Sequence, residues 1–226
     1  MKKIYIAGYP RSGNVWLARC LSDMYDCSIM ATEGRESIAQ RTGSNESVLI
    51  IQDHFVTSDN GVFVDGLSIN PALKTPDSEI IFMYRNPFDV AVSVSKYWGI
   101  ERACDALTVL SKGEKIVSVD WRNYTLQWIE QMEYLTAIVT YEEMRRNTMA
   151  TLVYLRNVLK IREKMSVVDI VRNNDIEKTR ERIAQNPSQF SYHQGIQMKH
   201  VRKGVVGDWH NHKAIRDLNE LWYKDK

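Results

Sequence analysis

Short apolar runs alternate with longer amphipathic segments along this chain. Such short runs, bounded by polar residues, are typical of buried strands. They predict strands at residues 4–7, 48–51, 79–84 and 136–140. Residues 31–47 are polar and are predicted to be irregular, whereas residues 57–78 are predicted to form a loop with one small strand at 62–64.

Apolar residues recur at helical spacing between these runs. The clearest helix start is Asn86 followed by Pro87, because asparagine caps helices and proline suits the first helical position. That helix is expected to end near Trp98. The other predicted helices begin near Gly13 or cover residues 118–132, 147–160, 166–172, 175–185 and 212–223.

Strands that alternate with helices predict an α/β fold, in which helices cover a central parallel sheet in three layers. Ligands bind at the carboxyl ends of the strands in such sheets. The segments Gly8–Gly13 and Gln52–His54 and the residue Arg85 each follow a predicted strand. We therefore expect them to meet at one edge of the sheet, within a single domain of residues 1–226.

The composition limits the partners that the protein is expected to have. The chain has 226 residues, 44% of them hydrophobic, and a net charge of +2, which is too small to indicate nucleic acid or a membrane surface as a partner. The three cysteines include no C-x-x-C pair, so a reduced, cytoplasmic compartment is expected. The apolar stretch after Lys3 is too short for a signal peptide, and no run is long enough to predict a membrane span.

Residues 8–16 (GYPRSGNVW) lie between a predicted strand and a predicted helix, as a phosphate-binding loop does. Two glycines five positions apart match the P-loop pattern G-x-x-x-x-G-K-[ST]. Asn14 stands in place of the lysine, and Val15 stands in place of the hydroxyl that binds Mg²⁺. The cation lies inside the loop, at Arg11. The loop therefore keeps an anion-binding backbone and suits a ligand that needs no metal.

Two further segments accompany this loop. Arg85 is followed by a serine eight positions later, at Ser93, and residues 202–209 read RKGVVGDW. Together with GYPRSGNVW, these resemble the signature segments of the sulfotransferases that use 3′-phosphoadenosine 5′-phosphosulfate, most closely the cytosolic type. The three segments stand in that family's order and span residues 8 to 209.

The resemblance implies a role for each matching residue. The loop residues that would wrap the 5′-phosphosulfate are Arg11, Ser12, Gly13, Asn14 and Val15. The residues that would hold or close over the 3′-phosphate are Arg85, Ser93, Arg202, Lys203 and Gly204. Trp16 and Tyr141 match positions around the adenine, and His54 matches the catalytic base.

Three departures from the family's pattern involve four positions. Arg11 replaces a lysine, the pair Asn14-Val15 replaces two threonines, and Gln52 replaces a lysine two residues before His54. Because arginine is always charged, Arg11 is expected to stabilise the leaving phosphate and the transferring group without donating a proton. Adenosine 3′,5′-bisphosphate would be the product of the donor, and no metal is expected, since His210 and His212 have no third ligand at zinc-like spacing.

Two other functions remain open from the sequence alone. One is a P-loop kinase or other nucleoside triphosphatase, and the other is a nucleotide-binding module without catalysis. The acceptor, a small molecule or a glycan, and the oligomeric state are not readable from the sequence. The aromatic residues that either line an acceptor pocket or belong to the core are Tyr97, Trp98, Trp121, Tyr124 and Trp128.

Overall fold

The computed structural model describes residues 1–33, 36–41, 43–53, 75–101, 103–112, 120–185 and 203–217. Within these ranges the strands form a six-stranded sheet in the order β3-β2-β4-β1-β5-β6. The strands are β1 (Lys2–Ala7), β2 (Ser28–Glu33), β3 (Glu36–Arg41), β4 (Val48–Asp53), β5 (Ser78–Tyr84) and β6 (Ala137–Thr140). All neighbouring pairs are parallel except β2 and β3, which are antiparallel.

Helices whose ends carry clear capping residues in the sequence begin and end close to the predicted positions. The side chain of Asn86 accepts hydrogen bonds from two backbone N–H groups of the first turn of α2, as an N-cap does. The α-helices are α1 (Asn14–Tyr25), α2 (Pro87–Trp98), α3 (Ala103–Lys112), α4 (Trp121–Glu130), α5 (Tyr141–Arg146), α6 (Thr148–Leu159), α7 (Val167–Asn173) and α8 (Ile176–Gln185). Two short 3₁₀ helices are η2 (Met132–Tyr134) and η4 (Asp208–Asn211).

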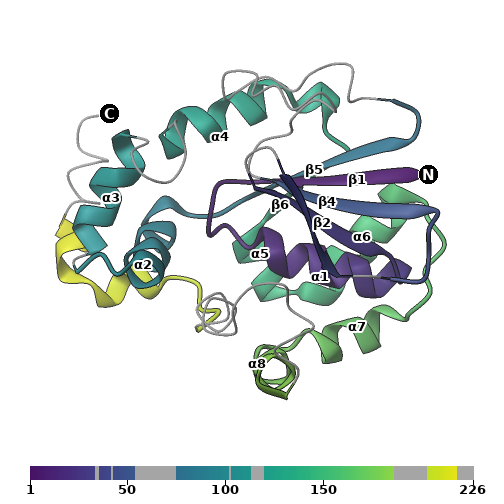
Figure 1. The fold of residues 1–226 in the computed structure, drawn as a ribbon. Helices are drawn as coiled ribbons and strands as arrows, with labels where there is room; N and C mark the ends of the chain where they lie inside the picture. Colours follow the sequence, from purple (N-terminus) through teal and green to yellow (C-terminus); the bar gives the residue numbers. More distant parts are fainter. Residues whose placement is uncertain are drawn as a thin grey trace.

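Two apolar cores cover the two faces of the sheet. One core joins the strands to α1, α5, α6 and α7, and the other joins them to α2, α3 and α4. Figure 1 shows the same division, with α4 on one side of the strands and α1, α5 and α6 on the other. The predicted three-layer arrangement is therefore present, with α2 and η4 beyond the carboxyl ends of the strands (Figure 1).

The prediction that residues 31–47 are irregular is wrong for its first part. Residues 31–33 belong to β2, and residues 36–41 form β3, at the edge of the sheet. Ser28 of β2 lies opposite Leu49 of β4, and β3 pairs with β2 alone. A polar segment can form such an edge strand, because backbone hydrogen bonds to one neighbour hold it and apolar alternation is not required. The small strand predicted at 62–64 lies outside the described residues.

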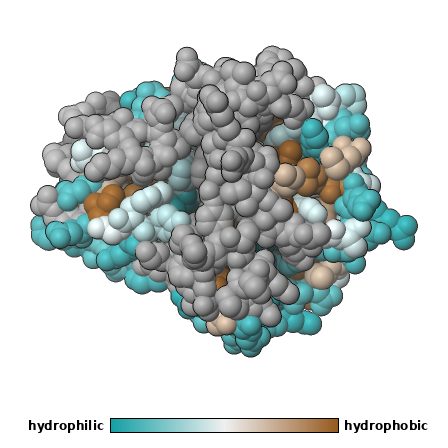
Figure 2. Space-filling model, viewed as in Figure 1, coloured by the Kyte–Doolittle hydropathy of each residue, from teal (hydrophilic) through white to brown (hydrophobic). Residues whose placement is uncertain are grey.

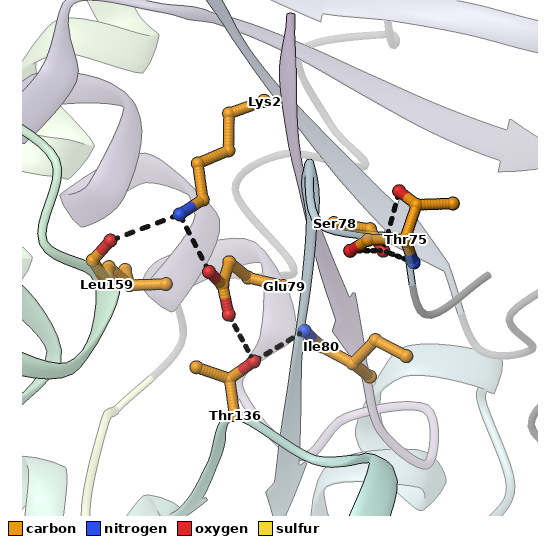
Figure 3. A network of polar contacts seen from close by, with 7 residues as sticks. All are labelled: Lys2, Thr75, Ser78, Glu79, Ile80, Thr136 and Leu159. Atoms are coloured by element: carbon orange, nitrogen blue, oxygen red, sulfur yellow. Dashed lines mark hydrogen bonds and ion pairs between the residues drawn. The ribbon is translucent and has the colours of Figure 1, made fainter.

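A network of hydrogen bonds and an ion pair holds together the amino ends of β1 and β5 and the start of β6 (Figure 3). The Lys2 ammonium lies 2.7 Å from one carboxylate oxygen of Glu79, and the other oxygen accepts a hydrogen bond of 2.6 Å from the Thr136 hydroxyl. That hydroxyl accepts in turn from the backbone N–H of Ile80, and Lys2 also donates to the last carbonyl of α6, at Leu159. The network fixes β1, β5 and the start of β6 at the edge opposite their carboxyl ends.

Among the described residues on the face drawn in Figure 2, most are hydrophilic, and the apolar ones form small separate groups. The exposed large apolar residues include Trp98 on α2 and Val205 and Val206 beside η4. Within the described ranges, none of the helices has the length and apolar character needed to cross a membrane.

Candidate functional site

The loop between β1 and α1 turns sharply into the helix. Arg11 and Gly13 both have positive φ angles, of 71° and 104°, and the Ser12 N–H donates a hydrogen bond of 3.1 Å to the Tyr9 carbonyl. The Asn14 side chain donates a hydrogen bond of 2.8 Å to the Gly8 carbonyl and closes the loop on itself. Because the first N–H groups of a helix have no partner inside it, the start of α1 adds donors for an anion.

Several buried polar atoms in and beside this loop have no described hydrogen-bond partner. Ser12 is fully buried, and its hydroxyl has no hydrogen-bond partner within the described ranges. The same is true of the side-chain oxygens of Asn14 and of Gln52, which is buried near the carboxyl end of β4. Buried polar groups without partners are costly, so these atoms indicate a site that a polar ligand completes.

Arg85 connects all three sequence segments. It follows β5, and its guanidinium donates to the backbone carbonyls of Arg11, at 3.3 Å, and Val205, at 3.2 Å. Its Cζ lies 3.9 Å from the centroid of the Tyr141 ring, which supports the face of the guanidinium. Its Nε is buried and has no partner in the described part of the chain. The predicted convergence at the carboxyl edge of the sheet is thus present for the loop and Arg85, and Val205, which that prediction did not include, lies at the same place.

Arg11 is held by α2. Its Nε donates a hydrogen bond of 3.1 Å to the Ser93 hydroxyl, and its Cζ lies 4.4 Å from the centroid of the Tyr97 ring. Sequence similarity grouped Ser93 with Arg85, whereas the hydrogen bond that Ser93 makes here is to Arg11. Ser93 therefore lies at the junction of the two predicted anion sites.

Two aromatic rings line the other side of the site. Trp16 in α1 and Tyr141 in α5 meet edge to face, with 6.0 Å between the ring centroids. Each ring carries a cation, since Arg85 stacks on Tyr141 and the Cζ of Arg145 lies 5.4 Å from the centroid of Trp16. The two rings predicted to surround the adenine are therefore adjacent. Sequence analysis missed Arg145, because an arginine in the last turn of a helix is common for dipole reasons alone.

A carboxylate anchors the segment that contains η4. Asp89 lies in the first turn of α2 and is 1% exposed. Its two oxygens accept hydrogen bonds from the backbone N–H groups of Gly207, at 2.7 Å, and Trp209, at 3.1 Å. The Trp209 ring also packs against Phe88, with 5.3 Å between centroids. Sequence analysis missed Asp89, because an acidic residue in a first helical turn already has an ordinary explanation.

The same segment presents Lys203 and Gly204. The Lys203 ammonium lies 3.1 Å from the buried carboxylate of Asp208, which shares that oxygen with the Asn211 amide. Gly204 packs so closely that a Cβ atom there would lie 2.8 Å from the Ile176 side chain. The backbone of this segment thus lies close to the side chains of Ile176 in α8 and Arg145 in α5.

The side chain of Tyr9, in the loop between β1 and α1, belongs to the apolar core beside α4. Burial raises the pKa of the Tyr9 hydroxyl above its usual value, and the negative charge of Asp120 raises it further. Across the described ranges, no cluster of three or more His, Cys, Asp or Glu side chains is arranged to hold a metal ion. His54 and Arg202, predicted as catalytic base and phosphate ligand, lie outside the described residues.

The five aromatic residues considered for an acceptor pocket differ in their surroundings. Tyr124 and Trp128 belong to the apolar core beside α4, and Trp121 packs against that core. Trp98 is exposed, and its ring meets the Tyr97 ring edge to face at 4.7 Å. Tyr97 and Tyr124 both have a described contact with the loop of residues 8–16: Tyr97 lies beside Arg11, and the Tyr124 ring meets the Tyr9 ring edge to face, with 5.3 Å between centroids.

Comparison with known proteins places these features in a family. The model of the sulfotransferase domain matches residues 1–220. The chain is 24% identical to the amine sulfotransferase of the rabbit Oryctolagus cuniculus, over 94% of this chain and 75% of that protein. It is 25% identical to human sulfotransferase 2A1, over 96% of this chain and 81% of that protein.

A solved structure has the same fold. The crystal structure of mouse sulfotransferase SULT7A1 complexed with PAP aligns with a TM-score of 0.70 and 24% sequence identity, covering 99% of this chain and 84% of that one. This likeness confirms the predicted α/β architecture with its central parallel sheet.

Proposed function

The chain belongs to the sulfotransferase family, and from this premise we propose that it transfers a sulfuryl group from 3′-phosphoadenosine 5′-phosphosulfate to a hydroxyl or amine of a small-molecule or glycan acceptor. The observation that carries the proposal is the position of Arg85. This single guanidinium hydrogen-bonds the loop at Arg11 and the segment at Val205, so three separate motifs share one site.

The residues present fit a donor with two separated anionic groups. The start of α1 after the loop, and the buried Ser12 hydroxyl, which has no described hydrogen-bond partner, suit the phosphosulfate end. Arg85, with its planar fork, and Lys203 suit the phosphate on the ribose. Trp16 and Tyr141 offer ring faces and edges for the adenine. When bound, the donor supplies an activated sulfuryl group that needs no metal to leave.

The chain's own residues would supply position, charge and a proton acceptor. Arg11 would balance the negative charge that gathers on the leaving phosphate, and a fixed cation in a buried site contributes strongly because it needs no reorganisation. His54 would take the proton from the attacking hydroxyl or amine, which typically contributes about 10²- to 10⁴-fold. The rest of the rate enhancement would come from holding the acceptor and the donor in line.

A transfer assay tests this function directly. We propose incubating the full chain with donor labelled in its sulfuryl group and with a panel of alcohols, phenols, amines and glycans. Labelled product, lost in His54→Ala while adenosine 3′,5′-bisphosphate still binds, supports the proposal. Absence of product across the panel, together with absence of bisphosphate binding, would sink it.

Two alternatives differ in what they require. A P-loop kinase needs a hydroxyl for Mg²⁺ in the first turn of α1, where this chain has Val15. A binding module without catalysis would keep the nucleotide contacts and show no transfer to any acceptor.

The rabbit relative is an amine sulfotransferase, so amines belong in the first round of acceptors.

A further inference from the structure

We propose that Tyr97 is a positioning residue that fixes the plane of the Arg11 guanidinium. The inference rests on the proposed sulfuryl transfer, and it extends that function by assigning a role to a residue outside the three sequence motifs. Tyr97 lies in the last turn of α2, whereas Arg11 lies in the phosphate loop.

The geometry gives Arg11 two separate supports on one helix face. Its Cζ is 4.4 Å from the Tyr97 ring centroid, and its Nε donates to Ser93 at 3.1 Å. Ser93 and Tyr97 are four residues apart, so they are neighbours on the same face of α2. A hydrogen bond at Nε and a ring near Cζ together define both the direction and the plane of the guanidinium.

The chemistry of arginine suits this arrangement better than that of lysine. A guanidinium is flat and delocalised, so it can stack on a ring with its face and bind an anion with its in-plane N–H groups. An ammonium has no such plane, and a ring beneath it would fix no orientation. Because the guanidinium also keeps its charge at all accessible pH values, its contribution to the reaction depends on where its N–H groups point.

The Tyr97 ring is itself in contact with a second aromatic ring, that of Trp98. The Trp98 ring meets Tyr97 edge to face at 4.7 Å, and Trp98 is the exposed member of the pair. Trp98, Tyr97 and Arg11 are therefore in contact in that order, with Trp98 exposed and the other two half-buried. Tyr97 is half-buried, so its contact with the cation is partly desolvated, which strengthens a cation–π interaction.

Steady-state kinetics and calorimetry separate positioning from general stability. We expect Tyr97→Leu to lower kcat by between about 2- and 30-fold, which corresponds to the usual range of cation–π strength. The Kd for adenosine 3′,5′-bisphosphate should change less than kcat, because Arg85 and Lys203 are untouched. Tyr97→Phe keeps the ring and should recover most of the loss. Tyr154→Leu, an exposed tyrosine on α6, is the matched control and should leave kcat and Kd unchanged.

A double-mutant cycle with Arg11→Lys identifies the partner. The cost of Arg11→Lys should be several-fold larger with Tyr97 present than in the Tyr97→Leu background, since contacting residues couple. Equal costs in the two backgrounds would overturn the proposal. So would equal losses in Tyr97→Phe and Tyr97→Leu, because the hydroxyl and not the ring would then be responsible.

The contact can also be tested without turnover. In arginine-labelled protein, the NMR signal of Arg11 Nε–H, assigned with Arg11→Lys, should be shifted upfield by the Tyr97 ring current and should lose that shift in Tyr97→Leu. If wild-type protein shows neither transfer nor bisphosphate binding, the proposed function fails, and the ring-current shift still decides the contact. Absence of the shift in wild-type protein would overturn the assignment of Tyr97.

Discussion

The Asp89 carboxylate accepts a hydrogen bond of 2.7 Å from the backbone N–H of Gly207, across 118 residues of sequence. With the second bond, from Trp209, it fastens the segment that carries Lys203 and Gly204 to the first turn of α2. The same helix supplies Ser93 to Arg11. The two ends of the proposed donor site therefore share one rigid element, and the anchor between them is a buried charge.

Asp89→Asn should loosen that anchor. The amide keeps the shape but loses the charge, and charge-assisted hydrogen bonds contribute about 1.5–3 kcal/mol each. We expect the Kd for adenosine 3′,5′-bisphosphate to rise about 10-fold, as a loss of about 1.4 kcal/mol of binding free energy implies. Asp169→Asn is a matched control, because Asp169 is also an acidic residue in a first helical turn, in α7. A lower melting temperature with unchanged Kd would show that Asp89 supports the fold alone.

Arg85→Lys keeps the positive charge but should still weaken the binding of adenosine 3′,5′-bisphosphate. Lysine cannot reach both carbonyls and an anion in one plane, and it loses the stacked position on Tyr141. We expect a Kd at least about 10-fold higher in calorimetry, since losing a charged hydrogen bond costs about 1.5 kcal/mol or more. Arg180→Lys, at an ion pair on the surface of α8, should change nothing. Similar Kd values for Arg85→Lys and wild type would remove Arg85 from the site.

Gly13→Ala tests the phosphate loop. Its φ of 104° disfavours any side chain, and an added Cβ would lie 2.7 Å from the Met83 methyl and 2.8 Å from the Tyr141 ring. Gly99 also has a positive φ, of 69°, but a Cβ there meets nothing within 4 Å. Gly99→Ala should therefore cost only the backbone term, about 1 kcal/mol of unfolding free energy, and Gly13→Ala should cost more and abolish bisphosphate binding. Equal costs by urea unfolding, with binding intact in both, would contradict this.

Glu79→Gln should separate stability from binding. Glu79 and Arg85 lie at opposite ends of β5, and the Lys2–Glu79 pair is only partly exposed. Loss of the ion pair should lower the free energy of unfolding by about 1 kcal/mol, while the hydrogen bond from Thr136 can persist. The Kd for the bisphosphate should stay the same. A Kd shift as large as that of Arg85→Lys would mean that the two ends of the strand are coupled.

The strongly patterned parts of this fold were predictable from the sequence. The Asn86-Pro87 start placed α2 correctly, because capping is a local effect that tertiary contacts do not override. The hairpin of β2 and β3 at the edge of the sheet was missed, since its polar residues carry no apolar alternation. The other strand that β2 pairs with, β4, lies further along the chain. The short helix α5 was also not predicted, because six residues are too few to show helical periodicity.

The site was predictable to the level of its motifs and not of its contacts. The resemblance to the sulfotransferases implied that Arg11, Arg85 and Lys203 would serve one ligand, which stays a prediction. The carboxyl-edge rule predicted that the loop and Arg85 would meet, as they do. No spacing indicates that Ser93 bonds to Arg11, that Asp89 anchors Gly207, or that Arg145 meets Trp16, because these pairs depend on how helices pack. The role of His54 as catalytic base stays a prediction.

The central claim is that this site binds a phosphosulfate donor without a metal, and calorimetry with adenosine 3′,5′-bisphosphate tests it most directly. The full chain should be titrated with the bisphosphate and with ATP, each in EDTA and in excess Mg²⁺. The account predicts tight bisphosphate binding that is the same in both buffers, and weak binding of ATP. Tight ATP binding that requires Mg²⁺, together with no binding of the bisphosphate, would contradict it.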